Sequence, residues 1–483
     1  MTDRLQTLVF WFFVAVVALA PLPLGSNREW SWTLCAVLVG AIGVAYAVTG
    51  LPGRAIADGR RRALGRQDSS RAHGAGQGLL AALFLAVVGW AVFQASGLAP
   101  AGWTHPLWAM TGDVLHGDAG TLAAHISLSP DDTLTAAMRL LSYGLVFWLA
   151  LQFGRDEHRA RRTLQVLIAA GCAYAVYGLY NFWSGSETFF WFENAAYRND
   201  VRGTFVNRNH YANYAGLVLL CALALFYRKT TVEGGAPPPA PRGGRIPRGA
   251  RVTTTADRVE QFALQVWKPL LVILLLTTAL ILTHSRGGFL STLAGGAALF
   301  YALTFRRKLR STGARAAIIA ATAIAAIAFW LTSEVLLQRI DRQGLEDNLR
   351  FSAYELVRES AAENPLLGFG YGTFADSFRL YRTDDITGFL DRAHNTYLEN
   401  IFELGWPAAL LLFALIAAVF LVCIRGVRNR GKDWFYPALG IGATVLTAIH
   451  AWFDFSLQMP AIAMTYAAIM GVAMAQSYSS RIT

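Results

Sequence analysis

Long apolar segments recur along almost the whole chain, and they restrict the possible folds more than any other feature. The 483 residues are 54% hydrophobic and only 15% charged, with a mean hydropathy of +0.38. A helical segment of about 20 apolar residues is long enough to cross a hydrocarbon core about 30 Å thick. Such segments predict an all-α, polytopic membrane protein with about twelve spans: 5–24, 30–50, 78–96, 133–153, 163–183, 209–227, 266–284, 287–305, 316–335, 398–424, 435–455 and 460–477.

Basic residues are distributed unevenly between the loops, and this distribution predicts the orientation. Arginines gather around 54–71, 155–162, 306–315 and 425–432, whereas 97–132 contains no Lys or Arg. Basic residues near the ends of spans are retained in the cytoplasm, so both termini are predicted to be cytoplasmic. The net charge of +11 is then mainly a consequence of topology, with some attraction to anionic lipid head groups. Nucleic-acid binding is the weaker alternative.

Two polar stretches divide the spans into groups. Residues 229–265 are rich in Pro, Gly and Arg and predict a flexible, basic cytoplasmic linker. Residues 336–396 predict a structured outward loop between the ninth and tenth spans, with a Gly-rich turn, GFGYGTF. The predicted organisation is therefore a six-span bundle over 1–228, the linker, three spans over 266–335, the outward loop, and the C-terminal spans over 397–483.

Most polar residues that could do chemistry are predicted at the outer ends of the spans. A secondary transporter would instead place polar groups near the bilayer midplane and would have two related halves. The distribution therefore favours an enzyme with a site facing outward. A twelve-span transporter and a non-catalytic scaffold for envelope assembly remain as alternatives.

Several arginines occupy these outer positions. Arg286 lies in a hairpin beside two glycines that allow a tight turn and leave backbone amides open to an anion. Arg350 lies in the outward loop, and Arg202 and Arg208 flank the sequence GTFVNRNH. Guanidinium groups match phosphate oxygens, so these side chains suit a pyrophosphate carried by a lipid. The alternative is that each extends to the membrane surface or pairs with a carboxylate.

His394 begins the sequence HNTYLENIFELG, which runs from the outward loop into a span. A histidine there can take a proton from an attacking hydroxyl, or it can simply cap or pack against the start of the helix. Glu399 and Glu403 lie one and two turns further along, four residues apart on one helical face. Either could orient the imidazole or neutralise an arginine.

Three further polar residues lie at span ends. Asn207 and Asn209 can cap a helix or hydrogen-bond a sugar or phosphate. Asp454 is acidic and close to hydrocarbon, which predicts a paired carboxylate, with one of the arginines as a candidate partner. The sequence has no HExxH or CxxC pattern, so the predicted chemistry uses no metal and no cofactor.

Four motifs in order resemble the O-antigen ligase and polymerase superfamily of bacterial envelope glycan transferases. They are GTFVNRN before a span, HSRGGFLS at an outward hairpin, RFSAYELVRESAAENPLLGFGYGTF in the outward loop, and HNTYLENIFELG leading into a late span. The resemblance extends over residues 200–460, whereas the first 200 residues match only as generic apolar spans.

The resemblance implies a multi-pass protein of the bacterial inner membrane with its active site facing the periplasm. It implies metal-independent, inverting transfer of a glycan from undecaprenyl pyrophosphate to an acceptor hydroxyl. By motif position, Arg286 and Arg350 bind the pyrophosphate and His394 is the catalytic base. The acceptor is the lipid A core in a ligase, or a further O-antigen or exopolysaccharide repeat in a polymerase. The ligase-like label is slightly favoured.

Overall fold

The computed structural model describes residues 2–63, 68–114, 123–186, 188–189, 192–193, 199–230, 255–305, 352–383 and 390–478. Arg350 and the predicted ninth span, 316–335, lie outside these residues, as does most of the predicted linker.

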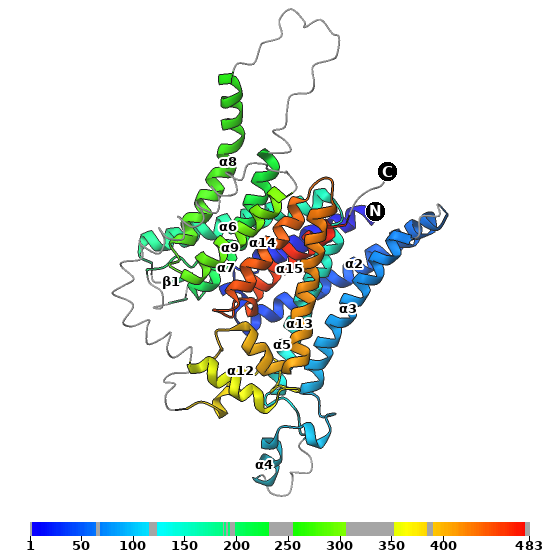
Figure 1. The fold of residues 1–483 in the computed structure, drawn as a ribbon, viewed down its shortest axis with the longest axis vertical. Coiled ribbons are helices and arrows are strands. Elements are labelled where there is room, and N and C mark those ends of the chain that lie inside the picture. The colour runs from blue at the N-terminus through cyan, green and yellow to red at the C-terminus, as the bar shows by residue number, and fades with distance from the viewer. Residues whose placement is uncertain are drawn as a thin grey trace, which may run out of the picture.

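The described residues form a bundle of helices with one small antiparallel hairpin, in which β1 (Thr188–Phe189) pairs with β2 (Phe192–Glu193) (Figure 1). The helices are α1 (Thr2–Leu19), α2 (Glu29–Ala63), α3 (Asp68–Ala95), α4 (Pro106–Val114), α5 (Pro130–Phe153), α6 (Glu157–Ser184), α7 (Arg208–Arg228), α8 (Thr255–Ile281), α9 (Arg286–Phe305), α12 (Phe374–Ser377), α13 (Thr396–Asn429), α14 (Phe435–His450) and α15 (Pro460–Ala475).

The helices agree with the apolar runs wherever the structure describes them. Seven are long and apolar enough to cross a membrane, namely α2, α3, α5, α6, α7, α9 and α13, or the larger part of each. The apolar parts of α1, α8, α14 and α15 are shorter. The all-helical membrane fold is therefore confirmed, and the total of twelve spans stays a prediction. Helix α8 begins at Thr255, so residues 255–265, predicted as linker, are helical.

Two helices form the centre of the bundle. Every residue of α15 is buried, mainly against α5, as expected for a helix that is apolar on all sides. Helix α14 packs closely on α9, where a Cβ added to Gly295 would lie 2.7 Å from the carbonyl oxygen of Gly442. Small residues permit this close approach of two backbones in a membrane protein. The contact brings the start of α9 close to the end of α14.

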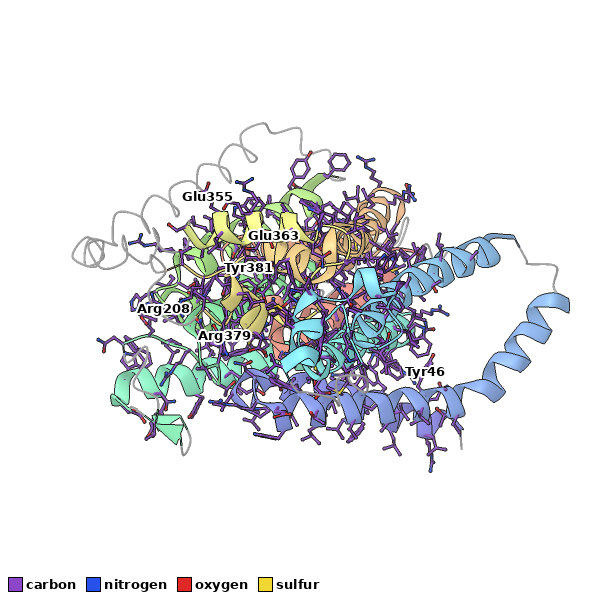
Figure 2. The ribbon with its side chains drawn as sticks, turned by 90° about the horizontal axis from the view of Figure 1, so that it is seen from below. Tyr46, Arg208, Glu355, Glu363, Arg379 and Tyr381 are labelled. Atoms are coloured by element: carbon purple, nitrogen blue, oxygen red, sulfur yellow. The ribbon has the colours of Figure 1, made fainter. Side chains whose placement is uncertain are left out.

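The two ends of the bundle differ in chemistry. Arg228 pairs with Glu157 at one end, where α6 begins and α7 ends. The opposite end carries α12 and α4, and it also carries the starts of α7, α9 and α13, where the motif residues lie (Figure 1). Seen from this second end, Arg208 is visible together with Glu363 and Tyr381, which share a hydrogen bond of 2.8 Å (Figure 2). The residues predicted at outer span ends that the structure describes therefore share one end of the molecule (Figure 1).

The Gly-rich turn packs against a break in α13. Gly405 interrupts this helix with φ of 75° and ψ of 160°, and Gly368 contacts the same break with φ of 71°. Gly370 N donates a hydrogen bond of 3.0 Å to Glu403 O, and Trp406 N donates one of 2.8 Å to Pro365 O. Left-handed backbone in such close contact requires glycine. The outward loop is thus held directly against the start of α13.

Candidate active site

Three histidines surround one buried aspartate at this end of the bundle. Asp454 is only 2% exposed and lies in the turn after α14. His210 Nε2 and His394 Nδ1 each lie 3.7 Å from its Oδ1 atom, and His450 Nδ1 lies 3.9 Å from its Oδ2 atom. We call these four residues the outer cluster. It joins the first turn of α7, the segment before α13 and the last residue of α14.

Asp454 is held as a carboxylate. Ser456 Oγ donates a hydrogen bond of 2.8 Å to Oδ2, and Phe455 N donates one of 2.9 Å to Oδ1. Burial alone would raise the pKa of Asp454, but the imidazoles of His210 and His394 lower it well below its usual range. The prediction that Asp454 is a paired carboxylate agrees with this arrangement, and its partners in the structure include three histidines.

His394 does not cap the helix that it precedes. The cap of α13 is Asn395, whose Oδ1 accepts hydrogen bonds from Tyr397 N at 3.0 Å and Leu398 N at 3.1 Å. His394 has φ of 51°, which is uncommon for a residue other than glycine. Its carbonyl accepts a hydrogen bond of 2.9 Å from the Tyr354 hydroxyl in the helix over 352–363. The helix cap at Asn395 and the hydrogen bond from Tyr354 therefore hold this unusual backbone conformation.

The His394 imidazole is oriented by the outer cluster. Phe455 packs edge-on against the ring at 5.0 Å and against the His210 ring at 4.7 Å. The side chain of His394 is 21% exposed, whereas that of His210 is 5% exposed. With an ionised carboxylate beside Nδ1, the proton of the neutral ring is favoured on Nδ1, and Nε2 keeps its lone pair. This is the geometry of a general base whose second nitrogen faces a carboxylate.

Arg286 is the first residue of α9, close to the same turn. Ser285 caps this helix, because its Oγ accepts a hydrogen bond of 3.2 Å from Gly288 N. A Cβ added to Gly287 would lie 3.9 Å from Phe453 Cβ, next to Asp454 in sequence. The HSRGG motif therefore starts beside the turn that carries the outer cluster. This places a guanidinium group at the end of the bundle where His394 lies.

The GTFVNRNH motif supplies structure as well as charge. Asn207 is the N-cap of α7, and its Oδ1 accepts a hydrogen bond of 2.8 Å from Asn209 N, which confirms the capping alternative for Asn207. Asn209 follows in the first turn and is partly buried. Arg208 Nη1 donates a hydrogen bond of 2.7 Å to Asp200, whereas Arg202 is 9% exposed on the same loop. The alternative that an arginine pairs with a carboxylate is thus confirmed for Arg208.

The two glutamates of α13 accept hydrogen bonds from segments that lie before this helix in the chain. Glu399 is fully buried and accepts hydrogen bonds from Arg392 Nη1 at 3.1 Å and Ala393 N at 2.9 Å. Glu403 accepts one of 3.0 Å from Phe374 N in the outward loop. Glu399 therefore has one of its two predicted roles, since it neutralises an arginine. The other role, orienting the imidazole of His394, is taken by Asp454.

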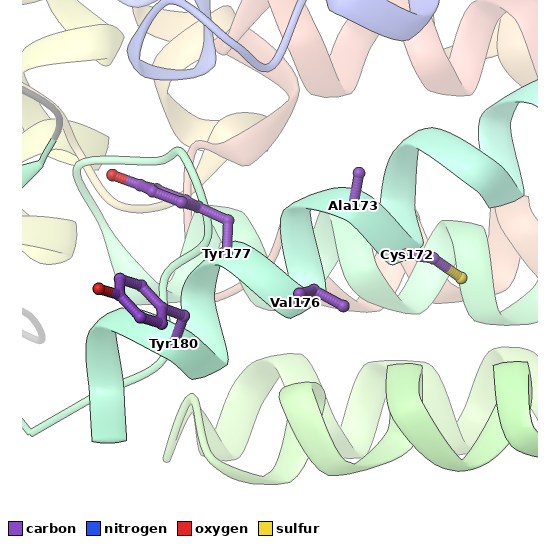
Figure 3. Close-up of a pocket in the computed structure, with 5 residues that line it drawn as sticks. All are labelled: Cys172, Ala173, Val176, Tyr177 and Tyr180. Carbon is purple, nitrogen blue, oxygen red and sulfur yellow. The ribbon is translucent and has the colours of Figure 1, made fainter. Parts of the chain in front are cut away.

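Two cavities accompany these residues. A cavity of about 1060 Å³ starts at Thr396 and Gln458, beside the outer cluster, and continues between apolar side chains of α3, α5, α13 and α15. A second, more open pocket of about 560 Å³ runs along α6, with Tyr177 and Tyr180 at one end of the lining stretch and Cys172 at the other (Figure 3). Only the larger cavity approaches the outer cluster.

Three members of this region were not predicted as functional residues. His210 lies inside the NRNH motif, and His450 precedes Asp454 by four residues, a spacing that would bring the two together on one face of a continuous helix, although α14 ends at His450. Ser456 follows Asp454 by two residues. The i, i+4 spacing was therefore the signal for His450. Among the residues that the structure describes, no group of three or more His, Cys, Asp or Glu is arranged to hold a metal ion.

Comparison with known families identifies one part of the chain. Residues 271–413 match the family model described as O-antigen ligase. This segment contains Arg286, Arg350 and His394, whereas His210, His450 and Asp454 lie outside it. A search of curated proteins found no match.

Proposed function

We propose that this chain, whose residues 271–413 match the O-antigen ligase family model, is a member of the O-antigen ligase/polymerase superfamily and transfers a glycan from undecaprenyl pyrophosphate to an acceptor hydroxyl. The family match and the long apolar helices support a multi-pass bacterial membrane protein that processes envelope glycans as a glycosyltransferase of the O-antigen ligase/polymerase type. We propose further that the reaction takes place at the periplasmic face of the inner membrane and needs no metal ion.

One observation supports this proposal most strongly: His394 Nδ1 lies 3.7 Å from the ionised, buried Asp454, while the ring remains 21% exposed. His394 Nε2 takes the proton of the acceptor hydroxyl, and the hydroxyl oxygen attacks the anomeric carbon of the donor. The bond from that carbon to the pyrophosphate breaks, and the pyrophosphate leaves with the bonding electrons. Attack opposite the leaving group inverts the anomeric configuration.

The charges that develop in this step match the charges of the site. The imidazolium formed on His394 is stabilised by Asp454, as in an Asp–His pair of a hydrolase. The leaving pyrophosphate gains negative charge, which we propose is stabilised by Arg286 and Arg350. Asn207, Asn209, Arg202, Glu399 and Glu403 are proposed to support the site rather than to react. General base catalysis of this kind contributes about 10²- to 10⁴-fold to a rate.

The acceptor is best identified in the native host. A deletion strain is complemented with the wild-type gene or with His394→Ala, and the surface glycans and lipid-linked intermediates are compared on gels. We expect long glycan to accumulate on the lipid carrier in the His394→Ala strain, and only the wild type to move it to the lipid A core, which identifies a ligase. Accumulation of single repeat units on the lipid carrier in the His394→Ala strain, in place of long glycan, would identify a polymerase.

The same experiment tests the proposal as a whole. Complementation with His158→Gln, an exposed histidine at the start of α6, is the control and is expected to restore the wild-type pattern. Unchanged glycans in the deletion strain itself would contradict a transferase and favour the transporter or scaffold alternatives.

A further inference from the structure

A second buried carboxylate holds a histidine at the same end of the bundle, apart from the outer cluster. His284 Nδ1 donates a hydrogen bond of 2.7 Å to Asp200 Oδ1, and Arg208 Nη1 donates one of 2.7 Å to Oδ2. The segments before α7 and α9 are also joined by a backbone hydrogen bond of 2.9 Å from Val201 N to Leu282 O. One carboxylate therefore fixes an imidazole and a guanidinium from two different segments.

The pair is unequal in exposure. The side chain of Asp200 is 5% exposed, whereas that of His284 is 39% exposed. Burial alone would raise the pKa of Asp200, but the hydrogen bond from His284 and the charge of Arg208 lower it, so the group is ionised at neutral pH. Nδ1 of His284 is therefore the donor. Its Nε2 is left for another partner, and no hydrogen bond to this atom is found among the residues that the structure describes.

The two segments that carry Asp200 and His284 are rich in basic residues. Segments 199–210 and 282–288 contain a single acidic residue, Asp200, against Arg202, Arg208 and Arg286. That single carboxylate is already shared by His284 and Arg208. The local excess of positive charge therefore favours an anionic ligand, and a phosphate oxygen is an acceptor that both imidazolium and guanidinium groups recognise.

A purely structural role explains only part of this arrangement. The hydrogen bonds to Asp200 hold the two segments together. Such a structural link requires neither an exposed imidazole nor an uncommon backbone conformation, yet His284 is partly exposed and has φ of 49°. Strained residues of this kind cluster at ligand sites. We propose that His284, positioned by Asp200, binds the diphosphate of the lipid-linked donor beside Arg286. This inference rests on the proposed function, and it adds a donor ligand that the motifs did not indicate.

Inorganic pyrophosphate is the probe that tests the site directly. Its binding is measured by calorimetry on the full chain in nanodiscs of phosphatidylcholine, and its inhibition of glycan transfer is measured in parallel. We expect His284→Gln to weaken pyrophosphate binding roughly tenfold, the effect of losing one hydrogen bond to a charged group. His284→Arg, which supplies a cationic donor at the same position, is expected to retain most of the binding, and His158→Gln is the matched control.

The kinetic pattern separates a ligand from a structural tie. If His284 is a ligand, His284→Gln is expected to raise KM for the lipid-linked donor about tenfold and to leave KM for the acceptor unchanged. A lower thermal midpoint with unchanged pyrophosphate affinity would overturn the inference. The inference would also be overturned if the protein bound phosphatidylglycerol nanodiscs in a way that depends on His284 but did not bind pyrophosphate. The ligand would then be a bilayer phospholipid.

The inference and the proposed function fail in different ways. If the wild type transfers glycan and His284→Gln binds pyrophosphate equally well, the inference is wrong and the function stands. If the wild type binds pyrophosphate through His284 but transfers no glycan, the anion site is supported and the proposed function is contradicted.

Discussion

The Nδ1 atom of His394 and the Oδ1 atom of Asp454 lie 3.7 Å apart, although one precedes α13 and the other follows α14. This distance is too long for a strong hydrogen bond and short enough for a charge interaction in a buried setting. Catalytic contacts are often loose before substrate binds and tighten in the reacting complex. The contact therefore gains strength when His394 takes a proton.

Asp454→Asn tests that charge interaction. The substitution keeps the size of the side chain but removes the negative charge that stabilises a protonated His394, so we expect kcat to fall by about 10²- to 10⁴-fold. Turnover is measured with saturating donor and acceptor. Asp376→Asn is the control, because this carboxylate is 47% exposed and pairs only with Arg379 among the described residues. Equal rates for Asp454→Asn and the wild type would remove Asp454 from the mechanism.

His210 and His394 share the same carboxylate oxygen but differ in access to a substrate. The side chain of His210 is 5% exposed, so we expect His210→Gln to reduce kcat by no more than about tenfold, against at least about 100-fold for His394→Gln. Both variants are measured in one reconstituted preparation. Losses of equal size would show that the two histidines act as a unit.

The contact between the Gly-rich turn and α13 predicts a stability effect. A Cβ at Gly368 would collide with the backbone of Glu403, and its φ of 71° is unfavourable for alanine. We expect Gly368→Ala to lower the free energy of unfolding by about 1–3 kcal/mol. The measurement is the thermal midpoint in detergent. Gly89→Ala in α3 is the control, because nothing lies within 4 Å of its added Cβ, and an unchanged midpoint in both variants would contradict the close packing.

Acid should weaken the link between the segments before α7 and α9. The pKa of Asp200 is lowered in the folded protein by His284 and Arg208, so the unfolded chain binds a proton more readily than the folded one. The stabilisation is present above the unfolded pKa of about 3.9 and is lost as the pH falls through the lower, folded pKa. We expect the thermal midpoint of Asp200→Asn to lie below that of the wild type at pH 7, with the difference shrinking below about pH 4. A constant difference at all pH values would argue against an ionic contribution.

Much of the fold could be predicted because hydrocarbon imposes a simple rule on sequence. Apolar runs long enough to span the bilayer coincide with helices such as α7 and α13, and the N-cap role of Asn207 follows from its residue type at a helix start. The shared end of Arg286 and His394 also follows, because span order alternates the sides of the membrane.

The partners within the site could not be predicted in the same way. An arginine was a candidate partner for Asp454, because several arginines lie at predicted outer span ends, yet the packing of α7 against α14 brings His210 to it. Such pairings depend on how helices rotate and cross, which hydrophobic periodicity does not specify. The same limit applies to Asp200 and His284, whose segments are brought together by the packing of α7 against α8 and α9.

The most direct measurement of the central claim is the rate of glycan transfer by the purified protein in proteoliposomes, with an undecaprenyl-pyrophosphate-linked glycan and a hydroxyl acceptor. Wild type, His394→Gln and His158→Gln are compared in a metal-free buffer containing a chelator. We expect the wild type and His158→Gln to turn over at equal rates and His394→Gln to lose at least about 100-fold. Full turnover by His394→Gln in a correctly inserted protein would contradict the role of His394 as the base.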